Sequence, residues 1–211
     1  MKTFKLTLLS AVVLVLHACA FFSKGEVTTR RYYSPDLPPS SAPGPVLRSS
    51  AELRLGRITA GASIAERMMF RESTHEVGFY DDRIWTEKPD SYLRRGLTRV
   101  LFEELGLRSV MSGSAPNLDV ELIRFEEVLA PTHVARVKIA FSLSDDRVVA
   151  LQQTLTVERA IELGSDDREG AAVAAAMGEA LREAITDLSG RVVSELARAQ
   201  QQSQQRGLAA P

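Results

Sequence analysis

The sequence predicts an α+β domain, a two-layer sandwich in which two helices pack on one face of a mainly antiparallel β-sheet. Two patterns carry this prediction. Segments 118–122, 137–143 and 149–157 alternate apolar and polar residues, as strands do when a sheet is covered on one side. Segments 93–105 and 173–196 place apolar residues three or four apart, which gathers them on one face of a helix. Strands, a helix, a meander and a second helix, in that order, favour the two-layer arrangement.

Residues 1–18 predict a secretory signal peptide. Two lysines precede an apolar run at 6–16, which as a helix spans ~17 Å and is too short for a hydrocarbon core of ~30 Å. A charged start, a short apolar run and a small residue before the cleavage point are typical of a secretory signal. The segment is therefore expected to be removed and not to anchor the chain as a helix.

The only cysteine of the chain, Cys19, follows directly on this run. The sequence from Leu16 to Cys19 resembles a bacterial lipobox, which implies cleavage after Ala18 and lipidation of Cys19. Two or three acyl chains hold a protein on a membrane stably. The alternative is that Cys19 is a chance buried thiol in a signal that is not cleaved or is cut elsewhere. Ala20 stands where such lipoproteins carry aspartate for inner-membrane retention, so the resemblance favours the periplasmic face of the outer membrane of a Gram-negative bacterium.

The mature chain begins with residues 19–50, a lipidated N-terminus and proline-rich linker that includes a short first strand at 30–34. Five prolines between residues 35 and 45 favour extended backbone and oppose pairing in a sheet. The α+β domain is expected at 51–199. A Gln-rich segment at 200–211 is expected to be a disordered tail.

The first half of the domain predicts two strand regions and a helix. Leu53 to Ile58 alternate as a half-buried strand. Segments 68–71 and 75–80, followed across Asp81-Asp82 by 83–85, predict a hairpin whose turn is the acidic pair. Pro89 opens a helix with apolar residues through Leu105, which ends at Gly106.

The last helix is expected from about residue 168 to 199, with Asp166 and Glu169 as its capping pair. It spans ~48 Å, whereas a strand of five or six residues spans only ~20 Å. The far half of the helix therefore needs another partner. Two readings stay open: a frayed surface end, or packing on a neighbouring subunit.

Composition and motifs argue against several classes of function. A net charge of -1 from 26 basic and 27 acidic residues gives no broad positive field for nucleic acid. The mature chain keeps only His75 and His133, both expected as ordinary surface or strand-edge residues, and has no Gly-x-Ser-x-Gly elbow. Ser112 and Ser114 lie in an expected turn. The acidic pairs at 81–82, 145–146 and 166–167 sit where turns and helix caps favour aspartate. The sequence therefore predicts a protein that is not an enzyme, with no metal and no cofactor.

Segment 79–89 concentrates aromatic and charged residues, including the only tryptophan. Tyr80, Arg83 and Trp85 are candidate partner-binding residues, because aromatic and arginine side chains are strong contact anchors. The alternative for Trp85 is a structural role, in the core or over the start of the next helix.

The motifs together resemble a known family. A lipobox at Cys19, Tyr32-Tyr33 before a proline-rich stretch, Tyr80 to Pro89 leading into a leucine-striped helix, Asp119 to Phe125, and an Ala-rich last helix from about Ala171 resemble the ABC-type transport auxiliary lipoproteins. The resemblance covers roughly residues 32–196. These proteins accompany MCE-domain lipid transporters, including the paraquat-inducible type.

That resemblance implies a lipid-anchored periplasmic adaptor of an MCE-type ABC lipid-transport system. Its expected partners are an MCE-domain protein with its permease and ATPase, the membrane through the acyl anchor, and a possible second copy of itself. It implies no hydrolysis of ATP by this chain. Two rival functions remain: a lipoprotein regulator or assembly factor of cell-wall or surface-polymer machinery, and a small periplasmic enzyme with an unrecognised nucleophile.

Overall fold

The computed structural model describes residues 29–35, 51–145, 147–163 and 169–208. Cys19, Ala18 and most of the proline-rich segment lie outside these residues. No helix in the described ranges has the length and apolar character needed to cross a membrane.

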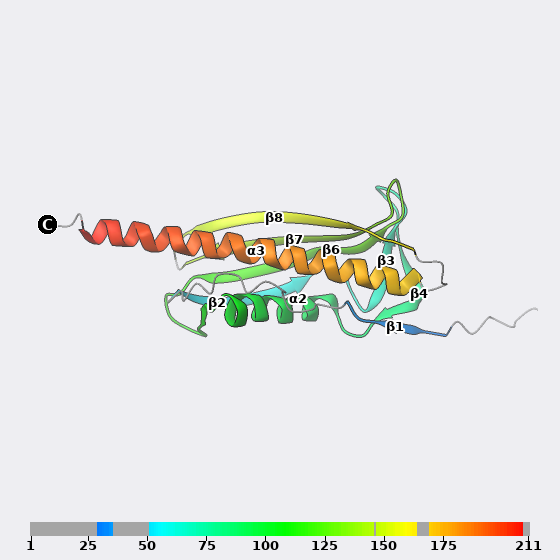
Figure 1. Ribbon diagram of the computed structural model, residues 1–211, viewed down its shortest axis with the longest axis horizontal. Coiled ribbons are helices and arrows are strands. Elements are labelled where there is room, and N and C mark those ends of the chain that lie inside the picture. The colour runs from blue at the N-terminus through cyan, green and yellow to red at the C-terminus, as the bar shows by residue number, and fades with distance from the viewer. Residues whose placement is uncertain (1–28, 36–50, 146, 164–168, 209–211) are drawn as a thin grey trace, which may run out of the picture.

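The described chain forms eight strands and two helical segments (Figure 1). The strands are β1 (Arg31–Tyr33), β2 (Glu52–Ala60), β3 (Arg67–Arg71), β4 (Val77–Trp85), β5 (Arg108–Ser109), β6 (Asn117–Val128), β7 (Val134–Ser144) and β8 (Val149–Ala160). The helices are α2 (Pro89–Thr98), which continues directly into the π-helical η2 (Arg99–Glu104), and α3 (Glu169–Leu208).

Strand β6 organises the sheet. One edge of β6 pairs antiparallel with β7, which pairs antiparallel with β8. The other edge is shared: the first half of β6 pairs parallel with β2, and its last two residues pair parallel with β3. Strand β4 pairs antiparallel with β3 and parallel with β1. The predicted α+β class is confirmed, and the shared edge makes the sheet mixed.

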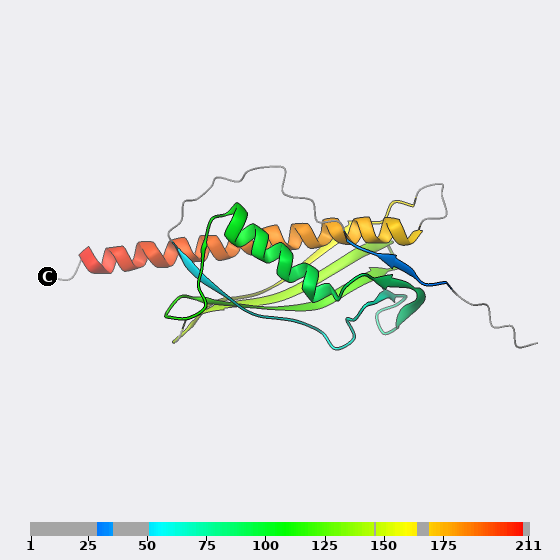
Figure 2. The same cartoon turned by 90° about the horizontal axis from the view of Figure 1, so that it is seen from below.

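Both helices cover the same face of the sheet, as predicted. Helix α3 contacts β7 and β8, α2 contacts β2, and the two helices touch one another. Figure 2 shows the helical layer on one side of the strands. The alternating apolar residues of β6, β7 and β8 point into this interface and join the helix stripes in one core, which includes Leu118, Val120, Leu122, Val137, Ile139, Leu155, Leu93, Leu97, Leu181 and Leu188. Burial of these side chains is the main force that holds the layers together.

The predicted hairpin exists, but the position of its turn was wrong. Strands β3 and β4 pair from Arg71 and Val77 outward, so residues 72–76 form the turn, and the Glu72 N–H donates to the Glu76 carbonyl at 3.2 Å. Asp81 lies inside β4, where its carboxylate accepts from Arg67 at 2.6 Å across the strands. An aspartate neutralised by a cross-strand arginine is tolerated within a strand.

The first predicted helix is confirmed from Pro89. Its final turn widens in η2, where the Leu105 N–H donates to the Val100 carbonyl at 2.9 Å. Gly106 then adopts a positive φ of 69°, the left-handed conformation that ends helices and favours glycine. The short strand expected at 30–34 is also confirmed, as β1.

The apolar face of the last helix, α3, is buried within this chain and needs no second subunit to cover it. Its stripe is buried from Val173 to Leu196, a span of ~36 Å. Strands β7 and β8 contain 11 and 12 residues and therefore reach ~37–41 Å, so they match the stripe. The prediction that the far half of this helix needs another partner rested on strands of five or six residues, and it was wrong for the stripe up to Leu196. The helix also continues past residue 199 to Leu208, so this part of the expected tail is helical. Asp166, the proposed capping partner of Glu169, lies outside the described residues.

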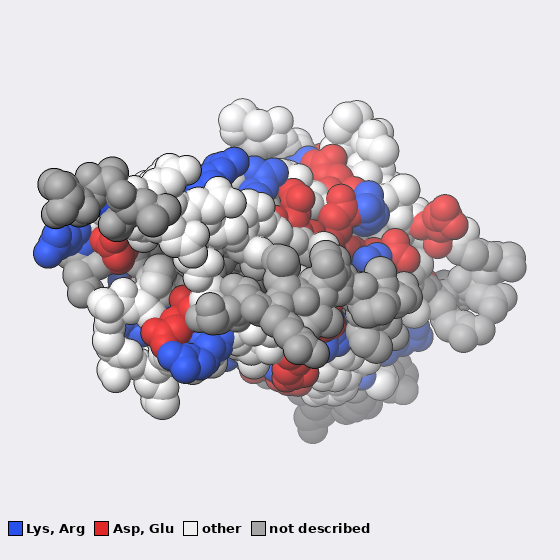
Figure 3. Space-filling model, turned by 60° about the vertical axis from the view of Figure 1, so that its left-hand side comes forward, with Lys and Arg blue, Asp and Glu red and all other residues white. Residues whose placement is uncertain are grey.

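The visible surface mixes charges of both signs. In Figure 3, acidic and basic side chains lie next to one another, and neither sign gathers alone over a broad area. This agrees with the near balance of 26 basic and 27 acidic residues in the chain.

Candidate functional site

The structure brings two of the three predicted partner-binding residues together and separates the third. Tyr80 and Arg83 lie on β4, and the guanidinium carbon of Arg83 stands 4.0 Å from the centre of the Tyr80 ring. Trp85, two residues further on, is only 2% exposed and packs edge to face on Phe125 at 5.2 Å. The Trp85 side chain therefore belongs to the core, and its place among partner-binding residues is corrected.

A glycine allows the Tyr80 ring its position. Phe70 of β3 lies opposite Gly78 of β4, and a Cβ on Gly78 would come within 2.2 Å of the Phe70 ring. The Phe70 ring fills this space and contacts Tyr80 at 4.8 Å between ring centres. The pairing of β3 with β4 is irregular between Arg67 and Met69, and such a bulge re-aims side chains.

Glu127 is the centre of this site. Glu127 lies near the end of β6, and its charged carboxylate is buried, with 1% of the side chain exposed. The Tyr80 hydroxyl donates to Glu127 Oε2 at 2.9 Å, His133 Nε2 lies 2.5 Å from Oε1, and Arg83 Nη1 lies 3.7 Å from Oε2. Arg83 also donates to Glu169 at 2.6 Å, in the first turn of α3. We call Tyr80, Arg83, Glu127, His133 and Glu169 the Glu127 cluster.

The electrostatics of the Glu127 cluster keep Tyr80 protonated and Arg83 charged. Burial, together with the charge of Glu127 and the hydrogen bond to it, raises the pKa of Tyr80 above its ordinary value. Burial alone would lower the pKa of Arg83, but the hydrogen bond to Glu169 and the nearby Tyr80, Glu169 and Glu127 raise it overall. A phenol held in its neutral form is a hydrogen-bond donor and not a nucleophile.

Three members of the cluster have the donor types of a metal site. One ligand atom each of Glu127, His133 and Glu169 lies within 4.8 Å of the others. Arg83 already supplies a positive charge to both carboxylates, through the 2.6 Å bond to Glu169 and the 3.7 Å approach to Glu127. The arrangement is therefore explained by ion pairing that ties β4, β6 and α3 together at one end of the sheet.

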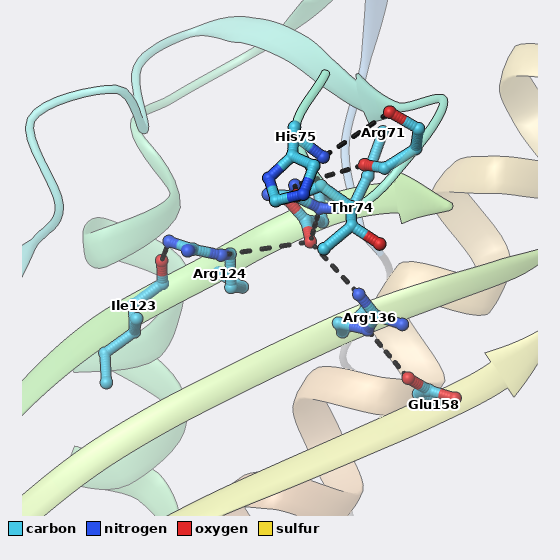
Figure 4. Close-up of polar contacts among 9 residues, drawn as sticks. Arg71, Thr74, His75, Ile123, Arg124, Arg136 and Glu158 are labelled. Atoms are coloured by element: carbon cyan, nitrogen blue, oxygen red, sulfur yellow. Dashed lines mark hydrogen bonds and ion pairs between the residues drawn. The ribbon is translucent and has the colours of Figure 1, made fainter. Parts of the chain in front are cut away.

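The opposite face of the sheet carries a second buried acid. Glu126 is completely buried, and Arg71 of β3 binds its two oxygens at 2.8 and 2.9 Å. Arg136 and Arg124 approach the same carboxylate at 3.5 and 3.9 Å, and Arg136 also pairs with Glu158 at 2.7 Å (Figure 4). The Glu126 hydrogen bond raises the pKa of Arg71. The bidentate Arg71–Glu126 ion pair links β3 to β6 at a place where only two residues of each strand are paired.

Sequence reasoning missed both acids, and it placed His133 as an ordinary strand-edge residue. The available signal was the adjacent pair Glu126-Glu127 between the apolar residues Phe125 and Val128. Successive strand residues point to opposite faces, so two adjacent glutamates in a covered strand require partners on both sides. His75 is exposed in the turn after β3, where its N–H donates to Ser73 Oγ at 3.4 Å.

The uncovered face of the sheet also has an open hollow of about 450 Å³. Polar side chains line it, among them Arg57, Asp119, Glu121, Ser142 and Gln152. A second hollow lies beside it along β2, where Gly56 leaves room for the side chain of Asp119. A Cβ added to Gly56 would come within 2.3 Å of Asp119 Oδ1. The Arg57 N–H donates to the same Asp119 oxygen at 2.7 Å. The hollow is thus a polar part of the sheet surface.

Comparisons with solved structures find this fold in other proteins. Protein XCC0632 from Xanthomonas campestris, described by the family model DUF330, aligns with a TM-score of 0.66 and 25% identity over 82% of this chain and 99% of its own. A structure described only as an uncharacterized protein aligns with a TM-score of 0.58 and 14% identity, over 80% and 99%. The hypothetical protein CT253 from Chlamydia trachomatis aligns with a TM-score of 0.51 and 9% identity, over 70% and 98%.

Matches at 14% and 9% identity show the fold alone. No protein-family model matches the sequence, and no curated protein matches it. The chain is therefore similar, over 99% of the other chain's length, to a Xanthomonas campestris protein that is described by the DUF330 family model.

Proposed function

We propose that this protein is a lipid-anchored periplasmic adaptor of an MCE-type ABC lipid-transport system, which docks the periplasmic components at the outer membrane. The observation that carries the proposal is the position of Cys19, the only cysteine, at the end of a signal-like segment and twelve residues before β1. The family resemblance of residues 32–196 supplies the choice of transport system.

The geometry of the tether supports an adaptor role. Twelve residues of chain reach at most ~40 Å, so acyl chains on Cys19 would keep β1 close to a membrane. Strand β1 pairs with β4, which carries Tyr80 and Arg83 of the Glu127 cluster. A tether that enters here confines the cluster end of the domain to within ~40 Å of the membrane, and the far end of α3 lies at the opposite end of the domain (Figure 1).

Tyr80 and Arg83 are proposed to shape the contact surface, and their exposed neighbours to make most of the contact. Arg83 keeps 14% of its side chain exposed, whereas Tyr32 of β1 is 62% exposed and Phe79 of β4 is 39% exposed. The ion pairs of the cluster fix β4, and the exposed aromatic residues on β1 and β4 supply rigid apolar contacts. The proposed role is that of a binding module and not of an enzyme.

Purification of the natively processed chain tests both the anchor and the partner. The full chain, tagged after Pro211, is extracted from its bacterium in mild detergent, and mass spectrometry identifies its N-terminal peptide and the proteins that copurify. An acylated peptide that begins at Cys19, together with an MCE protein, permease and ATPase, is expected. Acylated Cys19 with cell-wall enzymes instead would favour the alternative assembly-factor role, and an unacylated N-terminus would refute the anchor.

A pair of exposed substitutions tests the contact surface. Phe79→Ser should reduce copurification of the partner at least tenfold with the protein still folded. Met111→Ser is the matched control. Met111 is 95% exposed and lies in the loop before β6, whereas Glu127 and its cluster lie at the other end of β6. Equal losses from both substitutions, or none from Phe79→Ser, would place the contact elsewhere.

A further inference from the structure

Strand β8 forms a long edge of the sheet. In the described part of the chain it pairs only with β7, and it contains 12 residues. Edge strands leave backbone N–H and C=O groups free to pair with another chain, and proteins usually protect them with charged residues, proline or bulges. The stretch from Val149 to Val157 contains neither a charged residue nor a proline. Its pairing with β7 is irregular only near its start, before Leu151.

The charged end of β8 is already engaged within the chain. Glu158 accepts from Arg136 at 2.7 Å, and Arg159 pairs with Glu183 of α3. These contacts hold the last part of the strand against its own domain. The uncharged part, residues 151–157, is regular in its pairing with β7 and is the segment open to a further strand.

Alternate residues of this segment, those on the helix-covered side of β8, are arranged symmetrically about Gln153. Reading outward from Gln153, Leu151 and Leu155 stand at equal distances, followed by Val149 and Val157. When a strand pairs antiparallel with a copy of itself, residues whose numbers have the same sum lie opposite each other. Pairing about Gln153 sets Leu151 opposite Leu155 of the second copy, on the side of the sheet that the helices cover. On the other side it sets Gln152 opposite Thr154 and Ala150 opposite Thr156. Apolar residues therefore meet apolar residues on the helix side, and Ala150 is the one residue of this stretch that meets a residue of the other kind.

We infer that β8 pairs antiparallel with β8 of a second copy of this chain, with a two-fold axis at Gln153, so that the two sheets become one continuous sheet. A two-fold interface must be self-complementary, and the symmetric segment meets that requirement. The inference does not rest on the transport role proposed above.

The flank of α3 beside β8 is compatible with a second copy. A groove of about 460 Å³ runs between β8 and α3, and Leu151, Gln153 and Gly190 line it. Gly190 has open space around its Cβ position. Charges of opposite sign alternate along this flank and are paired within the helix, Arg191 with Asp187 and Arg198 with Glu195, both at 3.3 Å. Arg191 also donates to Gln153 Oε1 at 2.6 Å, which joins α3 to β8 across the groove. Two such flanks carry no excess of one sign to repel each other.

A charge-swap pair of variants tests this register. Gln152 and Thr154 are exposed on the uncovered face of β8, so substitutions there leave the core intact. Gln152→Lys with Thr154→Lys would place lysine opposite lysine, and we expect the dissociation constant of the dimer to rise at least tenfold. Gln152→Lys with Thr154→Glu would place opposite charges together, and we expect the dimer to persist.

The measurement is sedimentation of the full, natively processed chain in detergent, analysed for the mass of protein per particle. A wild-type chain that stays monomeric across micromolar concentrations would overturn the inference. Equal behaviour of the two double variants would also overturn it, because the register predicts opposite outcomes. Circular dichroism confirms that both variants are folded.

Cysteine cross-linking tests the position of the axis. In the proposed register Gln153 faces Gln153 of the second copy, whereas Thr156 lies ~20 Å along the strand from its own counterpart. Gln153→Cys should therefore form a disulfide-linked dimer under copper phenanthroline, and Thr156→Cys should not. The unsubstituted chain controls for Cys19. Cross-links from Thr156→Cys and not from Gln153→Cys would overturn the proposed register. Cross-links of either cysteine variant to a different protein would overturn the proposal that a second copy of the chain pairs with β8.

Discussion

Replacement of Trp85 by alanine distinguishes a core residue from a contact residue. The side chain is 2% exposed and packs on Phe125, so Trp85→Ala removes a complete buried indole and leaves a cavity. Such truncations cost ~3–5 kcal/mol. Domains of this kind are stable by roughly 5–15 kcal/mol in total, so the variant should lose a large part of its stability.

Urea unfolding followed by far-ultraviolet circular dichroism measures the effect. With a slope of ~2 kcal/mol per molar urea, a loss of ~4 kcal/mol lowers the midpoint by about 2 M. Tyr32→Ala is the matched control, since Tyr32 is 62% exposed on the neighbouring strand, and its cost should stay below ~1 kcal/mol. An unchanged midpoint for Trp85→Ala, with loss of partner binding, would refute the assignment of Trp85 to the core.

Three further predictions concern the Glu127 cluster and α3. The pKa of Tyr80 is raised in the folded state. The protonated Tyr80 side chain therefore contributes its full stabilisation below pH ~10, and this stabilisation is lost as the pH rises further. Tyr80→Phe should reduce the loss of stability that urea titrations measure at alkaline pH. Gly170→Ala should destabilise the domain by ~1–3 kcal/mol, because its Cβ would come within 2.5 Å of a tyrosine ring of β1, whereas Gly190→Ala in open space should stabilise it by ~0.5–1 kcal/mol. Truncation after Ala199 should leave the thermal midpoint nearly unchanged, whereas truncation after Leu188 removes buried stripe residues and should lower it by several degrees.

Much of the covered sheet face was predictable because period-two patterns mark one side of each strand. Leu118, Val120 and Leu122 alternate in the sequence and are all buried under the helices. The stripe from Val173 to Leu196 was likewise visible at helical spacing, and it is buried along its whole length. Local periodicity depends only on backbone geometry, so it survives without knowledge of the fold.

The site was predictable only in part. Tyr80 and Arg83 were selected as aromatic and charged residues of segment 79–89, on either side of an expected turn, and they meet on the single strand β4. Their partners Glu127 and Glu169 are 47 and 86 residues away in the chain from Tyr80 and Arg83, respectively. A single sequence carries no local signal for contacts at such separations, because they depend on how the strands are ordered in the sheet.

The sequence by itself determined the α+β class, the apolar faces of the three long strands and the start of the first helix, because each follows from residue type and spacing within a few turns of chain. Only the tertiary structure decided that β2 and β3 share one edge of β6, that Trp85 points into the core, and that Glu126 and Glu127 find arginine and tyrosine partners on opposite faces. These features depend on which strands become neighbours, and strand order is settled by the packing of the whole domain rather than by any one segment.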